Sequence, residues 1–393
     1  MTKRIGRSAA KTAGTIFLVF CVLVTTALGA VILVNVNQIG RLAYVAKLIY
    51  SDYLEDVTAE QLIEGATEGM VDVLGDPYSV FLNTQKFRDL YQMLDGKFGG
   101  IGIVLSLKDP ARLVISRPIN NTPASRAGIK AGDVIVKIDD LDTAGLDQDK
   151  AVEMMRGEPG TKVDLTLYRE STNQTFLVTL TRENISVPTV DGQALPGHPD
   201  IAYLHISQFS SYTGRELNET LEIMEIENYK GLILDMRYNH GGELEAAVQI
   251  ASRFIPEGPV VYIVNKRGSV DTKMSTGGYL DLPLVVLVNE ESASASEIVA
   301  GAIKDTGAGV IVGVTTFGKG IVQSIFPLNG GSGVKLTTAK YLTPDKLDIH
   351  KKGIEPDVAV ELEKGQSATI SPTDTAFDPQ LQRALEELQG KMR

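Results

Sequence analysis

Residues 292–323 read SASASEIVAGAIKDTGAGVIVGVTTFGKGIVQ, which combines a serine cluster, an apolar helix, a short strand and an isolated lysine. The apolar run of residues 295–304 predicts a helix that begins at the serines. Lys319 follows the strand and is flanked by two glycines. A serine that attacks a carbonyl needs a base, and a desolvated lysine can be that base. The stretch therefore predicts a hydrolase with Ser294 as nucleophile and Lys319 as base.

The segments around this stretch alternate between apolar strands and amphipathic helices. Strands are expected at residues 231–235, 284–288 and 310–312, and a further helix at residues 244–254. This alternation predicts βα units around a mostly parallel sheet that is buried on both faces. The expected fold class is therefore α/β, with Ser294 at a junction between a strand and a helix.

Backbone groups near this junction are candidates for an oxyanion hole. The first N–H groups of a helix have no partner within the helix, and such donors can bind a tetrahedral oxyanion. Ala295 offers one of them, and Gly241 or Gly242, after the strand at residues 231–235, offers a second. Glycine at that place lets the backbone approach a ligand. Gln323 follows Lys319 by four residues and is expected to hold the amine in place.

These residues also suggest two other interpretations, a helix cap and a phosphate-binding loop. Serines at such a junction are commonly helix caps and nothing more. Residues 313–319, GVTTFGK, also have the spacing of a phosphate-binding loop. That loop requires Ser or Thr next and then a helix, whereas Gly320 and a strand-like run follow. The nucleotide interpretation is therefore rejected.

The N-terminus predicts a membrane segment. Residues 14–34 carry no charge, and at 1.5 Å per residue they span roughly 30 Å, enough to cross a bilayer. Basic residues precede them without any acid, which predicts a cytoplasmic N-terminus and an extracytoplasmic remainder. A cleaved signal peptide is the alternative, because residues 27–30 are small enough for a cleavage site. Cys21 is the only cysteine, so no disulfide forms within the chain, and the bulky Phe20 before it argues against a lipoprotein.

Composition excludes several classes of partner. The net charge is −11, which argues against nucleic acid because phosphate binding needs a basic face. The four histidines, His198, His205, His240 and His350, are scattered without the spacing of a metal site. We therefore expect no metal and no cofactor.

The segments between the membrane span and the hydrolase region have two characters. Residues 36–96 are helical in pattern, with a capping box at Thr58 and Gln61, and suit either a packing subdomain or a homodimerisation element. Residues 97–183 contain short strands and turns. The glycine-rich turn in this region offers successive N–H groups that can capture a carboxylate, from Gly100, Ile101, Gly102 and Ile103.

Together these segments resemble the carboxy-terminal processing peptidases, or tail-specific proteases. The resemblance covers nearly everything from about residue 75 to the end. It rests on segments 98–103, 123–135, 156–161, 235–242, 292–297, 317–323 and 340–357, in the family's order. It implies a Ser/Lys serine peptidase with a crotonase-like core and a PDZ domain that engages substrate C-termini. It also implies that Gln323 orients Lys319, and that Ala295 with Gly241 or Gly242 holds the oxyanion.

The sequence thus predicts five parts. They are a basic tail and transmembrane helix (1–35), a helical subdomain (36–96), a PDZ domain (97–183), a peptidase core (184–365) and a tail with a C-terminal helix (366–393). The expected function is that of a membrane-anchored endopeptidase that cleaves extracytoplasmic protein or peptide substrates near or from accessible C-termini. The alternative is a catalytically silent PDZ scaffold. The joint presence of Ser294, Lys319 and Gln323 favours the enzyme.

Overall fold

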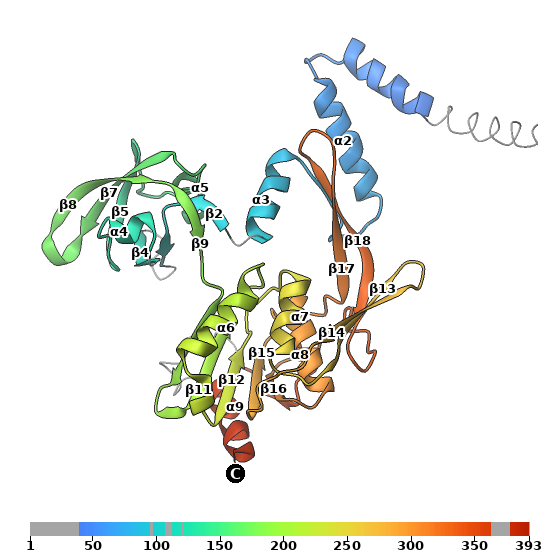
Figure 1. Cartoon of the computed structure of the whole chain (residues 1–393). Helices are drawn as coiled ribbons and strands as arrows, with labels where there is room; N and C mark the ends of the chain where they lie inside the picture. Colours follow the sequence, from blue (N-terminus) through green and yellow to red (C-terminus); the bar gives the residue numbers. More distant parts are fainter. Residues whose placement is uncertain (1–38, 95–96, 107–111, 120, 363–377, 393) are drawn as a thin grey trace, which may run out of the picture. The chain divides into compact units, whose positions relative to one another are not determined.

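The structure of the chain is a computed structural model. It describes residues 39–94, 97–106, 112–119, 121–362 and 378–392, which form the coloured ribbon in Figure 1. The chain divides into two compact units, Met1–Asp76 and Pro77–Arg393. The candidate catalytic residues all belong to the second unit.

The first unit is helical in its described part. Residues 39–52 form a helix, and α2 (Ala59–Asp72) follows it. The predicted capping box is confirmed, because the Gln61 N–H donates to the Thr58 hydroxyl at 3.2 Å and the Thr58 N–H donates to the Gln61 side chain at 2.8 Å. Several apolar side chains of these helices are exposed in the single chain, among them Leu42, Met70 and Val73.

The predicted membrane segment, residues 14–34, lies outside the described residues. Among the helices that the structure describes, none has both the length and the apolar character that a bilayer crossing requires. The transmembrane helix and its basic tail therefore stay predictions.

A β-rich region extends from Lys97 to Ser186. Its elements are β2 (Lys97–Gly100), β3 (Ile103–Leu105), β4 (Leu113–Pro118), α4 (Pro123–Arg126), β5 (Val134–Ile138), β6 (Leu141–Asp142), α5 (Gln148–Met155), β7 (Lys162–Arg169), a 3₁₀ turn at Glu170–Thr172, β8 (Gln174–Thr181) and β9 (Glu183–Ser186). The main sheet has the order β3-β4-β5-β7-β8, so β3 is an edge strand. Alternate strand residues fill an apolar core that includes Ile115, Ile135 and Leu165.

A six-stranded, mostly parallel sheet begins at residue 190. Its strands are β10 (Val190–Leu195), β11 (His198–Ile206), β12 (Gly231–Asp235), β15 (Leu284–Val288), β16 (Val310–Gly313) and β19 (Val358–Ala359), in that spatial order. All neighbours pair in parallel except β10 and β11. The predicted strands at residues 231–235, 284–288 and 310–312 are confirmed, and so is the mixed α/β class.

Helices cover both faces of this sheet (Figure 1). They are α6 (Thr213–Ile223), α7 (Leu244–Ser252), α8 (Ala295–Asp305) and α9 (Pro379–Lys391), with a 3₁₀ turn at Ile226–Asn228. Leu232, Leu234 and Val286 pack in one core cluster with α6, α7 and α8. Ile233, Val285 and Leu287 pack in another with Leu381, Ala384 and Leu388 of α9. Burial on both faces explains why these strands read as unbroken apolar runs.

A second sheet carries the loop that contains Lys319. Its strands are β1 (Val80–Leu82), β13 (Gly258–Asn265), β14 (Val270–Ser275), β17 (Ile321–Pro327) and β18 (Gly333–Leu342), and α3 (Thr84–Leu94) follows β1. The order is β1-β18-β13-β14, with β17 paired to β18 as an antiparallel hairpin. The β17–β18 hairpin therefore places the residues just before Ile321 next to the end of β18.

Candidate active site

Ser294 lies at the sharp turn between β15 and α8. The strand ends at Val288, and the helix begins at Ala295 with Ser294 as its N-cap residue. The backbone of Ser294 has φ +55° and ψ −111°, a conformation that residues other than glycine rarely adopt. Such strain persists where the surroundings fix it, which is common at functional sites. Ser294 also stands at the positive end of the helix dipole.

The three serines of this turn differ in their surroundings. Ser292 and Ser296 are fully buried, and their hydroxyls donate to the carbonyls of Met236 at 2.9 Å and Asn239 at 2.8 Å. Ser294 is half-buried. The outer serines thus fasten the turn to residues 236–239, and Ser294 is the one that a substrate can reach. The cap interpretation fits the place of Ser294 in the helix and does not conflict with a reactive hydroxyl.

A buried carboxylate joins the Ser294 turn to the Lys319 loop. Glu297 is 0% exposed, and its Oε2 accepts the backbone N–H of Ser294 at 2.8 Å and of Lys319 at 2.9 Å. Its Oε1 accepts the Thr316 hydroxyl at 2.6 Å and the Gly318 N–H at 2.7 Å. Four donors compensate the burial of this charge, as a buried carboxylate requires. The relative position of the two loops therefore depends on Glu297.

Lys319 has surroundings that disfavour its charged form. Burial lowers the pKa of its amine, the positive charge of Lys335 lowers it further, and the Glu297 carboxylate acts in the opposite direction. The Lys319 Nζ lies 4.9 Å from the centre of the Tyr78 ring. Within the described part of the chain it makes no hydrogen bond to Ser294. Catalytic hydrogen bonds often form only with substrate in place, so this resting geometry is compatible with a base.

The glycine pair after β12 approaches the Ser294 turn closely. A Cβ on Gly241, whose φ is +97°, would lie 2.8 Å from the Ser294 Cβ and 2.9 Å from the Ala295 nitrogen. A Cβ on Gly242 would lie 1.9 Å from the Phe209 carbonyl oxygen. No side chain fits at either place, so both positions need glycine. The structure therefore brings Gly241, Ser294 and Ala295 together, as the oxyanion-hole prediction requires.

Known proteins share this arrangement of segments. The sequence model of Peptidase family S41 matches residues 200–360, and the PDZ domain model matches residues 99–180. The Carboxyl-terminal-processing protease of Synechocystis sp. is 39% identical over 330 residues, which cover 83% of this chain and 76% of that protein. This chain belongs to the carboxyl-terminal processing proteases of peptidase family S41. The resemblance indicated by the sequence motifs is confirmed, and with it the assignment to the serine proteases.

Further relatives carry the same kind of name. The Carboxy-terminal processing protease CtpB of Bacillus subtilis is 37% identical over 319 residues, which cover 80% of this chain and 66% of that protein. The model of the activating protease CtpB N-terminal domain matches residues 29–86. A solved structure, the photosystem II D1 C-terminal processing protease, is 31% identical with a TM-score of 0.50, over 81% of this chain and 86% of that one.

The three N–H groups predicted for the oxyanion hole of the protease differ in whether they already donate a hydrogen bond. The Gly241 N–H already donates to the Asn239 side-chain oxygen at 2.9 Å. The N–H groups of Gly242 and Ala295 make no hydrogen bond to other described residues. The resting structure thus leaves Gly242 and Ala295 as the open donors of the three. Their role with substrate stays a prediction.

Gln323 lies in the protease close to Lys319 in sequence but does not bind it. Its Nε2 is buried and has no partner among the described residues. Lys319 precedes β17, and the pairing of β17 shifts register between Val322 and Gln323. Alternation counted along a regular strand therefore does not fix the direction of the Gln323 side chain. The contact between Gln323 and Lys319 therefore stays a prediction.

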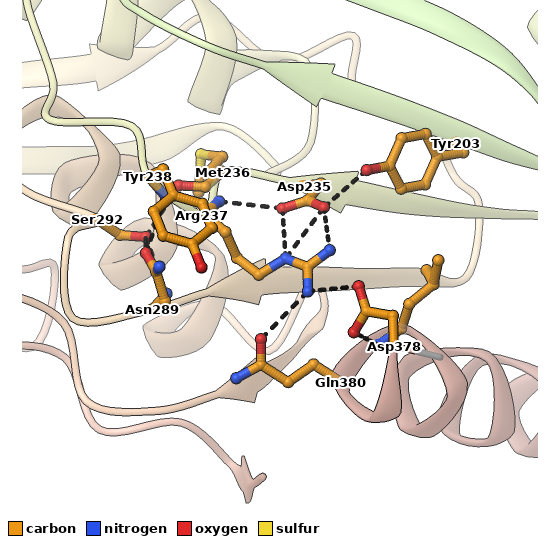
Figure 2. Close-up of polar contacts among 10 residues, drawn as sticks. Tyr203, Asp235, Met236, Arg237, Tyr238, Asn289, Ser292, Asp378 and Gln380 are labelled. Atoms are coloured by element: carbon orange, nitrogen blue, oxygen red, sulfur yellow. Dashed lines mark hydrogen bonds and ion pairs between the residues drawn. The ribbon is translucent and has the colours of Figure 1, made fainter. Parts of the chain in front are cut away.

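A buried ionic cluster supports the start of the oxyanion segment (Figure 2). The Arg237 guanidinium binds Asp235 at 2.6 Å and, across the sheet, Asp378 of the α9 cap at 2.8 Å. All three side chains are 0–1% exposed. Beside the cluster, the Tyr238 N–H donates to the Asn289 side chain at 2.8 Å, which connects this segment to the Ser294 turn. The C-terminal helix therefore contributes to the framework behind the site.

The predicted carboxylate-binding loop of the PDZ domain is also suited to its role. The carbonyls of Ile101 and Gly102 accept hydrogen bonds from Ala124 and Ile119, each at 2.9 Å. The N–H groups of Ile101 and Gly102 make no hydrogen bond to other described residues. Ile103 begins β3, whose outer edge is unpaired in the described sheet. Open donors next to an edge strand suit an extended peptide with a free carboxylate.

Two parts of this site are not among the residues predicted from the sequence, namely Glu297 and the pair of Arg237 with Asp378. Glu297 had a local signal, because Ser294 and Glu297 have the Ser-x-x-Glu spacing of a capping box. The pairing of Arg237 with Asp378 had none, since 141 residues separate them.

Proposed function

We propose that this chain is a membrane-anchored serine endopeptidase that cleaves extracytoplasmic proteins near or from their C-termini with a Ser294/Lys319 pair. The observation that carries the proposal is the Glu297 carboxylate, which binds the backbone of both residues at once. Family membership supports the chemistry, and the depressed pKa of Lys319 supports its role as base. These three points together favour the enzyme over a silent scaffold.

The first half of the proposed reaction forms an acyl-enzyme. The Lys319 amine, in its neutral form, takes the proton of the Ser294 hydroxyl as the Ser294 oxygen bonds to the scissile carbonyl carbon. The carbonyl oxygen becomes an oxyanion, which accepts hydrogen bonds from backbone N–H groups, with Ala295 and Gly242 as the open donors. When the C–N bond breaks, the Lys319 ammonium gives its proton to the leaving amine.

The second half reverses these roles with water. Neutral Lys319 takes a proton from a water molecule, whose oxygen attacks the ester carbon of the acyl-enzyme. The ester C–O bond then breaks, and the Ser294 oxygen recovers its proton from Lys319. In both halves Gln323 is proposed to hold the amine through its side-chain oxygen, which can accept a hydrogen bond from Lys319.

The resting position of Lys319 implies one movement before the first step. A cation above an aromatic ring is stabilised by the ring, so the contact with Tyr78 favours the ammonium. A base must be neutral. Leaving the Tyr78 ring for the Ser294 hydroxyl therefore favours the reactive form of Lys319.

The remaining parts of the proposal concern location and recognition. The uncharged segment at residues 14–34 is proposed as the bilayer anchor, with the protease domain extracytoplasmic. The PDZ loop at residues 100–103 is proposed to bind the C-terminus of protein or peptide substrates. The parallel sheet with helices on both faces supports the crotonase-like core. The exposed apolar side chains of the N-terminal helices support a homodimer through that region.

The test is cleavage of an unstructured protein substrate by the full chain in detergent. Ser294→Ala and Lys319→Ala should each lower kcat by about 10⁴-fold or more, and the double variant should be little worse, because groups that act as a unit are not additive. Two controls should retain activity: Ser252→Ala, whose hydroxyl donates to the Val248 carbonyl within its own helix, and Lys230→Ala, which is largely exposed. Full activity in Ser294→Ala would refute the assignment.

A further inference from the structure

Tyr341 lies between the backbone of the two proposed catalytic residues. It belongs to β18, where it pairs with Ile263 of β13, and it is 2% exposed. Its hydroxyl lies 3.0 Å from the carbonyl oxygen of Ser294 and 2.6 Å from that of Lys319. Its own N–H donates to the Gly320 carbonyl at 3.1 Å, so backbone and side chain both contact the Lys319 loop.

A phenol in this place acts as a donor to both carbonyls. A tyrosine hydroxyl has one proton, which the two carbonyl acceptors share. Burial raises the pKa of the Tyr341 phenol well above its ordinary value, and the Glu297 carboxylate adds to the rise. The hydroxyl therefore keeps its proton near neutral pH and can donate.

The contacts of Tyr341 complement those of Glu297. Glu297 accepts the N–H groups of Ser294 and Lys319, and Tyr341 donates to the carbonyls of the same two residues. Each catalytic residue is thus held on both sides of its Cα, by two side chains that each bind both residues. Ser294 follows β15 of one sheet, Lys319 precedes β17 of the other, and the two have no hydrogen bond to each other. The shared partners Glu297 and Tyr341 therefore act together with the bond from the Phe317 N–H to the Ser292 carbonyl, at 3.1 Å, to set their separation.

We propose that Tyr341 is a positioning residue, whose hydroxyl fixes the distance between Ser294 and Lys319 by binding both of their carbonyls. This inference rests on the proposed Ser294/Lys319 function. Proton transfer from Ser294 to Lys319 requires hydrogen-bond distance, and a displacement of about 1 Å can cost about 10²-fold in rate. Substrate binding does not involve the buried hydroxyl, so kcat should depend on it and KM should not.

The first experiment removes the hydroxyl alone. Tyr341→Phe in the full chain should lower kcat by about 10- to 100-fold with KM unchanged. Ile250→Val, which removes one buried methyl group from α7, is the matched control for lost stability and should retain kcat. Thermal melting of both variants compares their stability. If Tyr341→Phe and Ile250→Val have equal kcat, Tyr341 is structural only and the inference is overturned.

A second pair of variants keeps the test decisive if Tyr341→Phe does not fold. Replacement of Tyr341 by 4-aminophenylalanine keeps N–H donors at the same place, and replacement by 4-methylphenylalanine keeps the size without a donor. The amino variant should retain kcat within about threefold of the original, and the methyl variant should lose about 10- to 100-fold. Equal kcat in this pair would contradict the inference. If Ser294→Ala keeps its activity while Tyr341 is unchanged, the proposed function itself is contradicted.

Discussion

At the scale of single residues, Lys319 shows how charge and burial combine to make a base. Three groups face its amine or backbone from neighbouring elements: Lys335 of β18, Glu297 of α8 and the Tyr78 ring that precedes β1. Burial and Lys335 disfavour the ammonium, whereas Glu297 and the ring favour it. The net pKa is lowered, so a larger share of Lys319 is neutral near neutral pH than for an exposed lysine.

The dependence of kcat on pH should report this balance. The base is active without its proton, so kcat should rise with pH and reach half its maximum below the ordinary lysine pKa of 10.5. Lys335→Met removes a repelling charge, which raises the pKa of Lys319 and moves the profile to higher pH. Tyr78→Leu removes the ring that stabilises the ammonium and should move the profile to lower pH. Shifts in the same direction for the two variants, measured as kcat from pH 6 to 10, would contradict this account.

Glu297→Gln should damage both stability and turnover. The carboxylate accepts four donors, whereas an amide has one acceptor oxygen and an NH₂ group that would face N–H donors. We expect the free energy of unfolding to fall by roughly 2–3 kcal/mol and kcat to fall by about 10²-fold. Denaturant unfolding and peptide cleavage measure the two effects. Glu290→Gln, an exposed acid of the same turn, is the control and should change neither quantity.

At the scale of elements, the sequence predicts features that follow from a local pattern, but not those that depend on long-range contacts. The strands β12, β15 and β16 are visible because both faces are buried, which leaves continuous apolar runs. The helix α8 and its serine cap can be predicted from the sequence because the cap residues lie next to the apolar run. The pairing of β1 with β18 is not visible, because Val80 and Lys335 meet only in the folded chain. The side of β17 on which Gln323 lies depends on a register shift that no local pattern marks.

The helix α9 illustrates a contact that could not be predicted and that can be tested. Asp378 has two roles, since one oxygen caps α9 through the Leu381 N–H at 3.0 Å and the other binds Arg237 at 2.8 Å. Asp378→Asn keeps a good cap residue but removes the charge. Because Arg237 keeps Asp235 as a partner, the loss of stability should lie near the lower end of the roughly 3–5 kcal/mol for a broken buried pair. Chemical unfolding measures it.

The control for that change lies on the same helix. Arg383 forms ion pairs with Glu386 and Glu387 but is 46% exposed. Arg383→Ala should therefore cost less than about 1 kcal/mol. Equal losses for Asp378→Asn and Arg383→Ala would show that the buried cluster does not hold α9 in place.

At the scale of the whole molecule, we propose that recognition and bond breaking belong to different domains of one chain. The open N–H groups of the PDZ loop lie at residues 101 and 102, and the proposed catalytic pair lies at residues 294 and 319. In this proposal, a substrate bound by its C-terminus at the loop has a raised effective concentration for cleavage, because both sites belong to one chain. The C-terminal charge of a substrate should therefore affect the rate even though it takes no part in the chemistry.

A peptide with a free, apolar C-terminus should be cleaved faster than the same peptide with an amidated end. Amidation removes the charge that strengthens the hydrogen bonds, a loss of roughly 1.5–3 kcal/mol, or about 10- to 100-fold in kcat/KM. Gly102→Ala should abolish the preference, because its φ is +79° and a Cβ would lie 2.3 Å from the Thr122 side chain. Gly145→Ala is the matched control, since its φ is +75° but no atom lies within 4 Å of the added Cβ. Equal kcat/KM for the two peptides with the unaltered protease would refute capture of the substrate carboxylate by this loop.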